Sequence, residues 1–361
     1  MKKTNDRLVL PLGRNDLHLA AHLFAPARLT LARDMRRVTK VELADRIDKS
    51  AAAVSQFEAG RTRPDPKTLA SISLALGFPI GFFARKSESS LLVDACHFRS
   101  LRSASQRERR RLLALGTLRC DLLSLLEEHV ELPPEQISTI SRSVRSMEDI
   151  EECASDVRRA WGLGLGPIPN LLSLFESRGI VVSHIPDDCE AVDAFSAWHR
   201  GRPLVFLVRH TESTSRLRYD AAHELGHLVM HVDVIAGSPE IERQANRFAG
   251  AFLLPKEPFL VECPRRLDWN HFYELKVRWR VSVAALLRRA YDLDCISEAS
   301  YRRAFVHLNR TGERFAERHE PPNEHASLLH KAIQLVAEDL HQGQIADILG
   351  IQASDLQELA Q

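Results

Sequence analysis

The length, charge and cysteine content of the chain exclude several classes of protein. Its 361 residues, 44% of them hydrophobic, are enough for two or three domains with buried cores. A formal net charge of +1 excludes a polycation, so any affinity for nucleic acid has to be local. The six cysteines form no Cys-x-x-Cys pair, no apolar run is long enough to span a membrane, and the N-terminus lacks a signal-like apolar run. We therefore expect a cytoplasmic protein with reduced thiols and no membrane partner.

Residues 1–26 show no strong pattern and form an N-terminal extension. Residues 27–84 predict a domain of five short helices that contains a helix-turn-helix. Thr39 and Ser50 are typical N-cap residues for two consecutive helices, and Ala44 is small where these helices would cross. Four apolar side chains would supply their shared core: Leu43, Ile47, Val54 and Phe57.

The turn between the two helices carries Asp48 at a position usually held by Gly, which Asp can occupy because it tolerates left-handed backbone. The segment 39–60, with its continuation through 61–78, resembles the lambda-repressor/Cro-like (XRE) DNA-binding domain. This resemblance implies double-stranded operator DNA as a partner. It also implies a homodimer that binds two half-sites about one helical turn apart.

The second helix of the motif begins with three alanines, which offer methyl groups to thymine but no hydrogen bonds to base edges. Specificity would then depend on Ser55, Gln56 and DNA shape, while basic residues contact phosphates. The predicted DNA-contacting residues are Lys40, Lys49, Ser50, Ala51, Ala52, Ser55, Gln56 and Arg61. Three further arginines near the motif are candidates for phosphate contact or for ordinary solvation: Arg36, Arg37 and Arg63.

Residues 85–160 form a connector and a helical segment. A helix is predicted from about residue 105 to 129, where leucines recur at helical spacing. The spacing of these leucines favours a helix that packs on other helices of its own domain, and not a helix that forms a leucine zipper between two chains. The basic start of the helix, at residues 107–111, favours a solvated face over contact with DNA or a partner.

The pattern H-E-x-x-H at residues 223–227 is the most informative motif of the chain. On a helix, His223 and His227 lie on one face, where two imidazoles can bind Zn²⁺, and Glu224 beside them is a candidate general base. An apolar stripe on the other side would anchor this helix: Ala222, Leu225 and Val229. Gly226 predicts a close approach by another backbone. A chance occurrence is the alternative, so the motif needs a third ligand.

A second predicted helix supplies a candidate for the third metal ligand. It begins at Ser238 as N-cap with Pro239 in the first turn and ends before Pro255. Glu242 lies at the edge of its apolar stripe, where an unpaired carboxylate is costly unless a metal or partner meets it. The alternative is that Glu242 pairs with an arginine on a solvated face. Two imidazoles and one carboxylate are the ligand number of a catalytic zinc site.

The H-E-L-G-H motif followed by Glu242-x-x-Ala245-Asn246 and by Leu253-Leu254-Pro255 resembles the ImmA/IrrE family of zinc metallopeptidase-like proteins. The similarity covers residues 161–310, and residues 98–101 resemble a connector of fused members. The resemblance implies that His223, His227 and Glu242 are zinc ligands and that Glu224 is the general base. One departure is Gln244, where many members have an acidic residue. His231 is a proton donor, an alternative ligand or a helix cap.

The remaining segments complete the expected architecture. Strands are predicted at 179–185, 191–198 and 203–208, as a small sheet beside the zinc helix. Residues 320–361 form a C-terminal helical module whose 344–359 stretch mimics helix-turn-helix spacing, and we interpret it as a packing module. The fold class is mainly α with a small β-sheet (α+β): a five-helix DNA-binding domain, a gluzincin-like domain and C-terminal helices.

The functional hypothesis is a DNA-binding transcriptional regulator that carries a zinc metallo-endopeptidase domain. Such an enzyme would bind an extended peptide along an edge strand of the small sheet. By the resemblance, its substrate would be a regulatory protein. Two alternatives keep the same ligands: a transcription factor whose zinc domain senses a small molecule or partner without cleavage, and an antitoxin-like repressor.

Overall fold

The computed structural model describes most of the chain. The described residues are 16–85, 96–97, 105–137, 144, 146–185, 193–208, 213–231, 238–313, 317–338 and 340–360. Most of the N-terminal extension and the connector at 98–101 therefore lie outside the described residues. Two compact units divide the chain. Unit 1 contains 1–92, 105–131 and 329–361, and unit 2 contains 93–104 and 132–328. Among the described residues, no helix combines the length and apolar character needed to cross a membrane.

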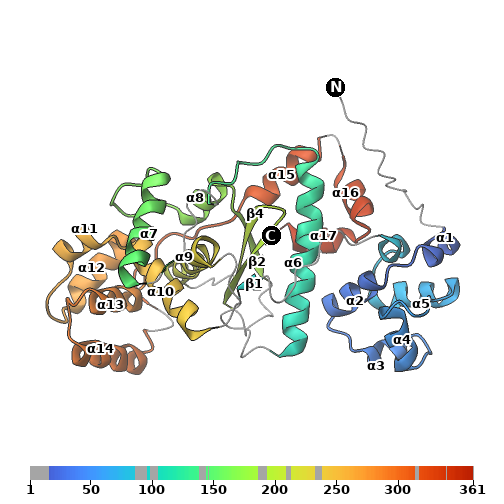
Figure 1. The fold of residues 1–361 in the computed structure, drawn as a ribbon, viewed down its shortest axis with the longest axis horizontal. Coiled ribbons are helices and arrows are strands. Elements are labelled where there is room, and N and C mark those ends of the chain that lie inside the picture. The colour runs from blue at the N-terminus through green and yellow to red at the C-terminus, as the bar shows by residue number, and fades with distance from the viewer. Residues whose placement is uncertain are drawn as a thin grey trace. The chain divides into compact units, whose positions relative to one another are not determined.

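The first part of unit 1 is a group of short helices (Figure 1). They are α1 (Leu17–His22), α2 (Pro26–Met35), α3 (Lys40–Arg46), α4 (Ala51–Glu58), α5 (Pro66–Leu76) and the 3₁₀ helix η1 (Ile80–Ala84). Thr39 caps α3 in a capping box with Glu42, and Ser50 caps α4 by accepting from the Ala53 amide. Asp48 has φ 52°, in the left-handed region, as predicted for the turn.

The second part of unit 1 adds α6 (Gln106–Glu127), α15 (Leu328–Val336), α16 (Gln342–Leu349) and α17 (Ala353–Leu359). The buried guanidinium of Arg119, on α6, donates to the carbonyls of Glu358 and Leu359 at 3.3 and 3.4 Å. Arg36, on the C-terminal side of α2, pairs with Asp355 of α17 at 2.8 Å. The α6 leucines are buried within the chain, so they do not form an exposed zipper. The C-terminal helices therefore pack into the same unit as the helix-turn-helix.

Unit 2 contains a sheet with the strand order β1-β3-β4-β2. The strands are β1 (Cys96–His97), β2 (Val181–Ile185), β3 (Ala194–His199) and β4 (Arg202–Val208). The pairs β3–β4 and β1–β3 are antiparallel, and β2–β4 is parallel. The three predicted strands correspond to β2, β3 and β4 with slightly shifted ends. The short strand β1 was not predicted.

The described part of unit 2 also contains eight helices (Figure 1): α7 (Met147–Ala160), α8 (Leu171–Ser177), α9 (Thr214–Met230), α10 (Pro239–Leu253), α11 (Lys256–Glu262), α12 (Trp269–Trp279), α13 (Val283–Asp292) and α14 (Glu298–Thr311). Helix α9 packs against β3, β4 and α10. Its predicted stripe is fully buried: Ala222, Leu225 and Val229. At Gly226 the close neighbour is a side chain and not a backbone, because an added Cβ would lie 3.1 Å from Phe248 Cδ1 on α10.

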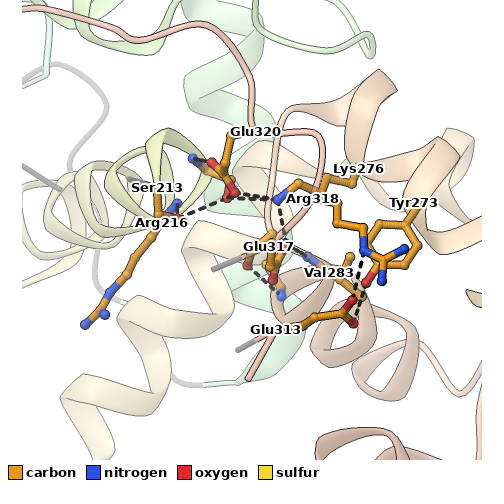
Figure 2. Close-up of polar contacts among 12 residues, drawn as sticks. Ser213, Arg216, Tyr273, Lys276, Val283, Glu313, Glu317, Arg318 and Glu320 are labelled. Carbon is orange, nitrogen blue, oxygen red and sulfur yellow. Dashed lines mark hydrogen bonds and ion pairs between the residues drawn. The ribbon is translucent and has the colours of Figure 1, made fainter. Parts of the chain in front are cut away.

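A segment after α14 ties the start of α9 to the rest of unit 2, and we call residues 317–324 the acidic strap. The buried ammonium of Lys276 contacts Glu317 at 2.6 Å and Glu320 at 2.5 Å (Figure 2). Glu320 also accepts from the backbone amide of Ser215 at 2.9 Å. Carboxylates are favourable at a helix N-terminus, where backbone amides lack intrahelical partners. The strap therefore fixes the first turn of α9.

The same strap caps a second helix. Glu324 accepts from the amides of Leu171 and Leu172, at the start of α8, at 2.7 and 3.0 Å. Its other oxygen pairs with the buried guanidinium of Arg218 on α9. One carboxylate thus joins the first turn of α8 to the second turn of α9, which limits movement of α9 relative to the sheet.

Candidate metal centre and nucleic-acid interface

Helices α9 and α10 bring three candidate ligands together. His223 and His227 are buried on one face of α9, one helical turn apart. Their Nε2 atoms are 3.0 Å from each other. Glu242, in the first turn of α10, places Oε2 at 3.2 Å from His223 Nε2 and Oε1 at 3.6 Å from His227 Nε2. The structure therefore gathers the two histidines and the carboxylate that the sequence suggested, and Glu242 faces the histidines, not an arginine.

This donor set fits a zinc ion. Zinc accepts imidazole nitrogen and carboxylate oxygen at about 2.0–2.2 Å, so two ligands of a tetrahedral ion lie about 3.3 Å apart. The separations of 3.0, 3.2 and 3.6 Å bracket that value. All three possible ligand atoms lie within 4.8 Å of one another. The group is suited in charge and geometry to a divalent cation.

Glu224 stands apart from this group although it adjoins His223 in sequence. Its carboxylate is buried, and Oε2 accepts a hydrogen bond of 2.6 Å from the hydroxyl of Ser196 on β3. Ser196 is itself fully buried. The sequence carries no signal for this role of Ser196, because no spacing rule connects a strand residue to a helix residue 28 positions later.

His231 contacts the second nitrogen of a candidate ligand. It is the C-cap residue of α9, and its Nδ1 lies 3.1 Å from His227 Nδ1. Its Nε2 lies 2.8 Å from Oε1 of Gln244 on α10. Burial lowers the pKa of His231, although Gln244 and Glu242 oppose the shift. His231 is therefore held neutral behind His227, which does not fit a cationic helix cap.

The predicted DNA-contacting residues lie in and around α4. Lys49, Ser50, Ala52, Gln56 and Arg61 are exposed. Ala51 and Ser55 are half-buried on the same helix. Lys40 is also half-buried, and its ammonium pairs with Glu58 at 3.0 Å, so phosphate contact would compete with this ion pair.

Two of the nearby arginines have structural contacts instead of free guanidinium groups. Arg36 donates to the carbonyl of Leu76 at 3.0 Å, in addition to its pair with Asp355. Arg63 donates to the carbonyl of His22 at 2.7 Å. These contacts were not foreseen, since the sequence only showed that the arginines are near the motif. Lys49 and Arg61 are the better candidates for phosphate contact.

Comparisons with known proteins agree with both parts of the chain. Residues 29–83 match the family model described as Helix-turn-helix, and residues 175–291 match the model described as IrrE N-terminal-like domain, which represents a metallopeptidase family. A search of curated proteins found no match. The chain is a DNA-binding regulator with an IrrE-like peptidase domain fused behind its helix-turn-helix. The resemblance to XRE and ImmA/IrrE proteins is thereby confirmed.

Proposed function

We propose that the IrrE-like domain is a zinc-dependent endopeptidase and that the helix-turn-helix binds an operator as a homodimer. The observation that carries the first part is the cluster of the buried His223 and His227 with the half-buried Glu242, and a separate buried carboxylate, Glu224, next to it. The first three residues would hold the metal. When bound there, zinc supplies Lewis acidity toward a peptide carbonyl and toward water.

Glu224 would act as the general base. Its carboxylate is not one of the three clustered groups, and the Ser196 hydroxyl holds it in place at 2.6 Å. A base in this position removes a proton from the attacking water and delivers it to the amine that leaves the cleaved peptide bond. Burial of the carboxylate excludes bulk water from this transfer.

The substrate class follows from the sheet and from the fused domain. Helix α9 packs against β3, whose neighbour β1 is the edge strand of the described sheet, so an extended peptide added at this edge would lie on the β3 side of the sheet, toward the candidate metal centre. Because the same chain carries a DNA-binding domain, we propose a regulatory protein as the substrate. The alternatives without cleavage, a sensor of a ligand or partner and an antitoxin-like repressor, remain outcomes of the test below.

Glu224→Gln separates the enzyme from the other two functions. The variant should keep zinc, fold and DNA binding, because the amide is isosteric and Glu224 is not a proposed ligand. Loss of a general base costs about 10² to 10⁴ in rate, which would abolish visible cleavage. The measurement compares wild type and variant in the native cell by quantitative proteomics and by transcription from the bound promoter. If the variant stabilises no protein and regulates normally, the domain is a sensor or a structural module.

DNA binding is tested on α4 and its flanks. Gln56→Ala should reduce discrimination between operator and unrelated duplex, because Gln56 is an exposed amide on the expected readout helix. Lys49→Ala should weaken all duplexes alike and lower the salt slope by about one unit. Lys67→Ala, in the first turn of α5, is a matched control for charge. Equal affinity for every sequence, or a curve without salt dependence, would leave this domain as a protein-interaction module.

A further inference from the structure

The first turns of α6 carry basic side chains that lie outside the matched helix-turn-helix, which ends at residue 83. Arg107 and Arg110 are exposed and three residues apart, so they lie on the same side of this helix. Arg111 is half-buried and pairs with Glu358 of α17 at 3.4 Å. We call the two exposed arginines, Arg107 and Arg110, the α6 basic pair.

Helix α6 packs against α2 in the opposite chain direction, within unit 1. Asp121, in the later part of α6, pairs with Arg28 in the first turn of α2 at 2.7 Å. At the other end of α6, Arg107 Nη2 lies 3.5 Å from Oε2 of Glu42, which is in the first turn of α3. The sequence favours a solvated face for the start of α6, but these two ion pairs place the α6 basic pair beside the start of α3.

The charges at the start of α6 also act on the end of α2 and on the turn that follows it. Burial raises the pKa of Asp34, near the end of α2, while the charges of Arg33 and Arg110 oppose this shift. Hydrogen bonds of its capping box lower the pKa of Glu108, and the charge of Arg37, in the turn between α2 and α3, acts in the same direction. The start of α6 and this turn therefore form one continuous charged surface.

The docking of a helix-turn-helix brings this surface to DNA. In such a motif the second helix, here α4, enters the major groove, while the first helix, here α3, crosses the sugar-phosphate backbone. The contact between Arg107 and Glu42 sets the start of α6 next to the helix that crosses the backbone. The α6 basic pair therefore lies on the side of unit 1 that meets phosphates.

The ion pair with Glu42 does not occupy Arg107 permanently. The two side chains are 53% and 43% exposed, and exposed ion pairs contribute little to stability. Glu42 also has a partner of its own, because it completes the capping box with Thr39 at the start of α3. A phosphate oxygen can thus replace Glu42 as the partner of Arg107 without loss of the helix cap.

We propose that Arg107 and Arg110 contact phosphates of the same DNA duplex that the helix-turn-helix binds, so that α6 extends the DNA interface beyond the matched domain. This proposal rests on the proposed function, because it requires the helix-turn-helix to hold the duplex. Guanidinium groups suit this role, since they can bind phosphate oxygens through two parallel hydrogen bonds. Such contacts add affinity and fix the position of the domain on DNA, but they carry no sequence information.

The test measures how DNA binding by the full-length protein depends on salt. The probe is a fluorescein-labelled duplex of mixed sequence, about three helical turns long, because phosphate contacts require no operator. Fluorescence anisotropy gives the affinity at each salt concentration. The double variant Arg107→Gln with Arg110→Gln should bind more weakly and lower the salt slope by about two units per bound subunit, since each neutralised phosphate contributes about 0.9.

Two controls separate the effect of charge from an effect on the fold. Arg107→Lys with Arg110→Lys keeps both charges and should keep the salt slope of wild type. Lys331→Gln removes an exposed charge from α15 in the same unit and should leave the slope unchanged. Glutamine and lysine are both good helix formers, so α6 should stay folded in each variant, which thermal unfolding checks.

Equal affinity and equal salt slope for wild type and the glutamine variant would overturn the proposal. It is also overturned if the lysine variant loses as much slope as the glutamine variant, because the effect would then not come from charge. Lys49→Ala distinguishes this failure from failure of the proposed function. If Lys49→Ala lowers the slope and the glutamine variant does not, the helix-turn-helix binds DNA without α6. If neither variant lowers the slope, DNA binding by the helix-turn-helix fails, and the α6 contact fails with it.

Discussion

At the scale of single residues, a chain of hydrogen bonds sets the tautomer of one candidate ligand. The Gln244 amide nitrogen faces Glu240 Oε1 at 3.4 Å, which leaves its Oε1 to accept from His231 Nε2. His231 then presents Nδ1 as an acceptor to His227 Nδ1–H at 3.1 Å. His227 is left with a lone pair on Nε2, on the side of Glu242. The amide at position 244 thus fixes which nitrogen of His231 carries the proton, while burial lowers the pKa of the ring against the opposing effect of this hydrogen bond.

Gln244→Leu should weaken zinc binding without removing a ligand. The leucine cannot accept from His231, so the ring of His227 loses the partner that fixes its tautomer and orientation. Loss of such a partner typically costs about 10- to 100-fold in metal affinity. Competition with a chromophoric chelator measures the change. Arg243→Gln, on the exposed neighbour, is the control and should bind zinc as wild type. Equal affinity for Gln244→Leu and the control would show that the hydrogen-bond chain has no effect on the metal.

The part of this site that the sequence predicted is the part governed by helical spacing. His223 and His227 follow from a four-residue interval, and Glu242 follows from its place near the start of a second amphipathic helix. Ser196 could not be predicted, because its contact with Glu224 depends on how β3 packs against α9. The contact between His231 and Gln244 depends in the same way on the approach of α9 to α10.

At the scale of elements, α9 is positioned by residues far along the chain. Two residues in the first turn of α9 form hydrogen bonds with the segment after α14. Ser215 donates to Glu320, 105 residues later, and Thr214 donates to Asn323, 109 residues later. Lys276 of α12, whose side chain is buried, neutralises Glu317 and Glu320 of the acidic strap (Figure 2). The family match ends at residue 291, so Glu320 and Asn323 lie beyond the matched stretch. The helix that carries the candidate ligands is therefore anchored in part by residues C-terminal to the matched domain.

Lys276→Met should destabilise unit 2 because it leaves two carboxylates of the strap without their buried cation. Removal of one partner of a buried ion pair typically costs about 3–5 kcal/mol. Urea unfolding, followed by the fluorescence of unit 2 tryptophans, measures the loss. Lys256→Met, on an exposed lysine of α11, is the matched control and should change stability little. A variant as stable as the control would mean that the strap is not held by its charges.

Most elements could be predicted because their signals are local. Thr39, Ser50 and Ser238 mark helix starts, and the alternating or β-branched runs mark three strands. Strand β1 carries no such signal, since two residues show no periodicity. The sequence predicted that backbone approaches Gly226, but the close neighbour is the ring of Phe248. A glycine in a helix indicates that there is little space beside it, but it does not indicate which atoms occupy that space.

At the scale of the whole molecule, segments that the sequence predicts as separate parts of the chain pack into the same compact unit. Sequence analysis placed 85–160 and 320–361 in segments of their own. In the structure, 105–131 and 329–361 join the helix-turn-helix in unit 1. The contacts responsible span long intervals, as in the pair of Arg36 with Asp355, 319 positions apart. No local pattern predicts such a pair, although the interpretation of the C-terminal helices as a packing module agrees with it.

Unit 2 has its own long-range junction at Glu151 of α7. This carboxylate contacts Arg289 of α13 through both oxygens, at 2.5 and 2.7 Å, and Arg247 of α10 at 2.8 Å. Burial alone would raise the pKa of Glu151, but the hydrogen bonds and charges of the two arginines outweigh it and lower the pKa below its ordinary value of 4.5. One carboxylate therefore joins the second helix of the metal site to two of the surrounding helices.

The stability of unit 2 should accordingly fall in acid. A carboxyl group whose folded pKa is lowered stabilises the fold above its unfolded pKa and loses that contribution as the pH falls through its folded pKa. Wild type should lose stability as the pH decreases below about 4.5. Glu151→Gln should be less stable at pH 7, because two arginines lose their counter-charge, and its stability should fall less between pH 5 and pH 3.

Urea titrations of both proteins across this pH range measure the difference. Glu152→Gln, which changes the neighbouring carboxylate on α7, is the matched control and should retain the steeper acid dependence of wild type. Parallel pH profiles for wild type and Glu151→Gln would contradict a stabilising role for the ionised Glu151 carboxylate. The difference between the two slopes thus measures how much of the acid sensitivity of unit 2, which holds the candidate metal centre, comes from the pairing of Glu151 with its two arginines.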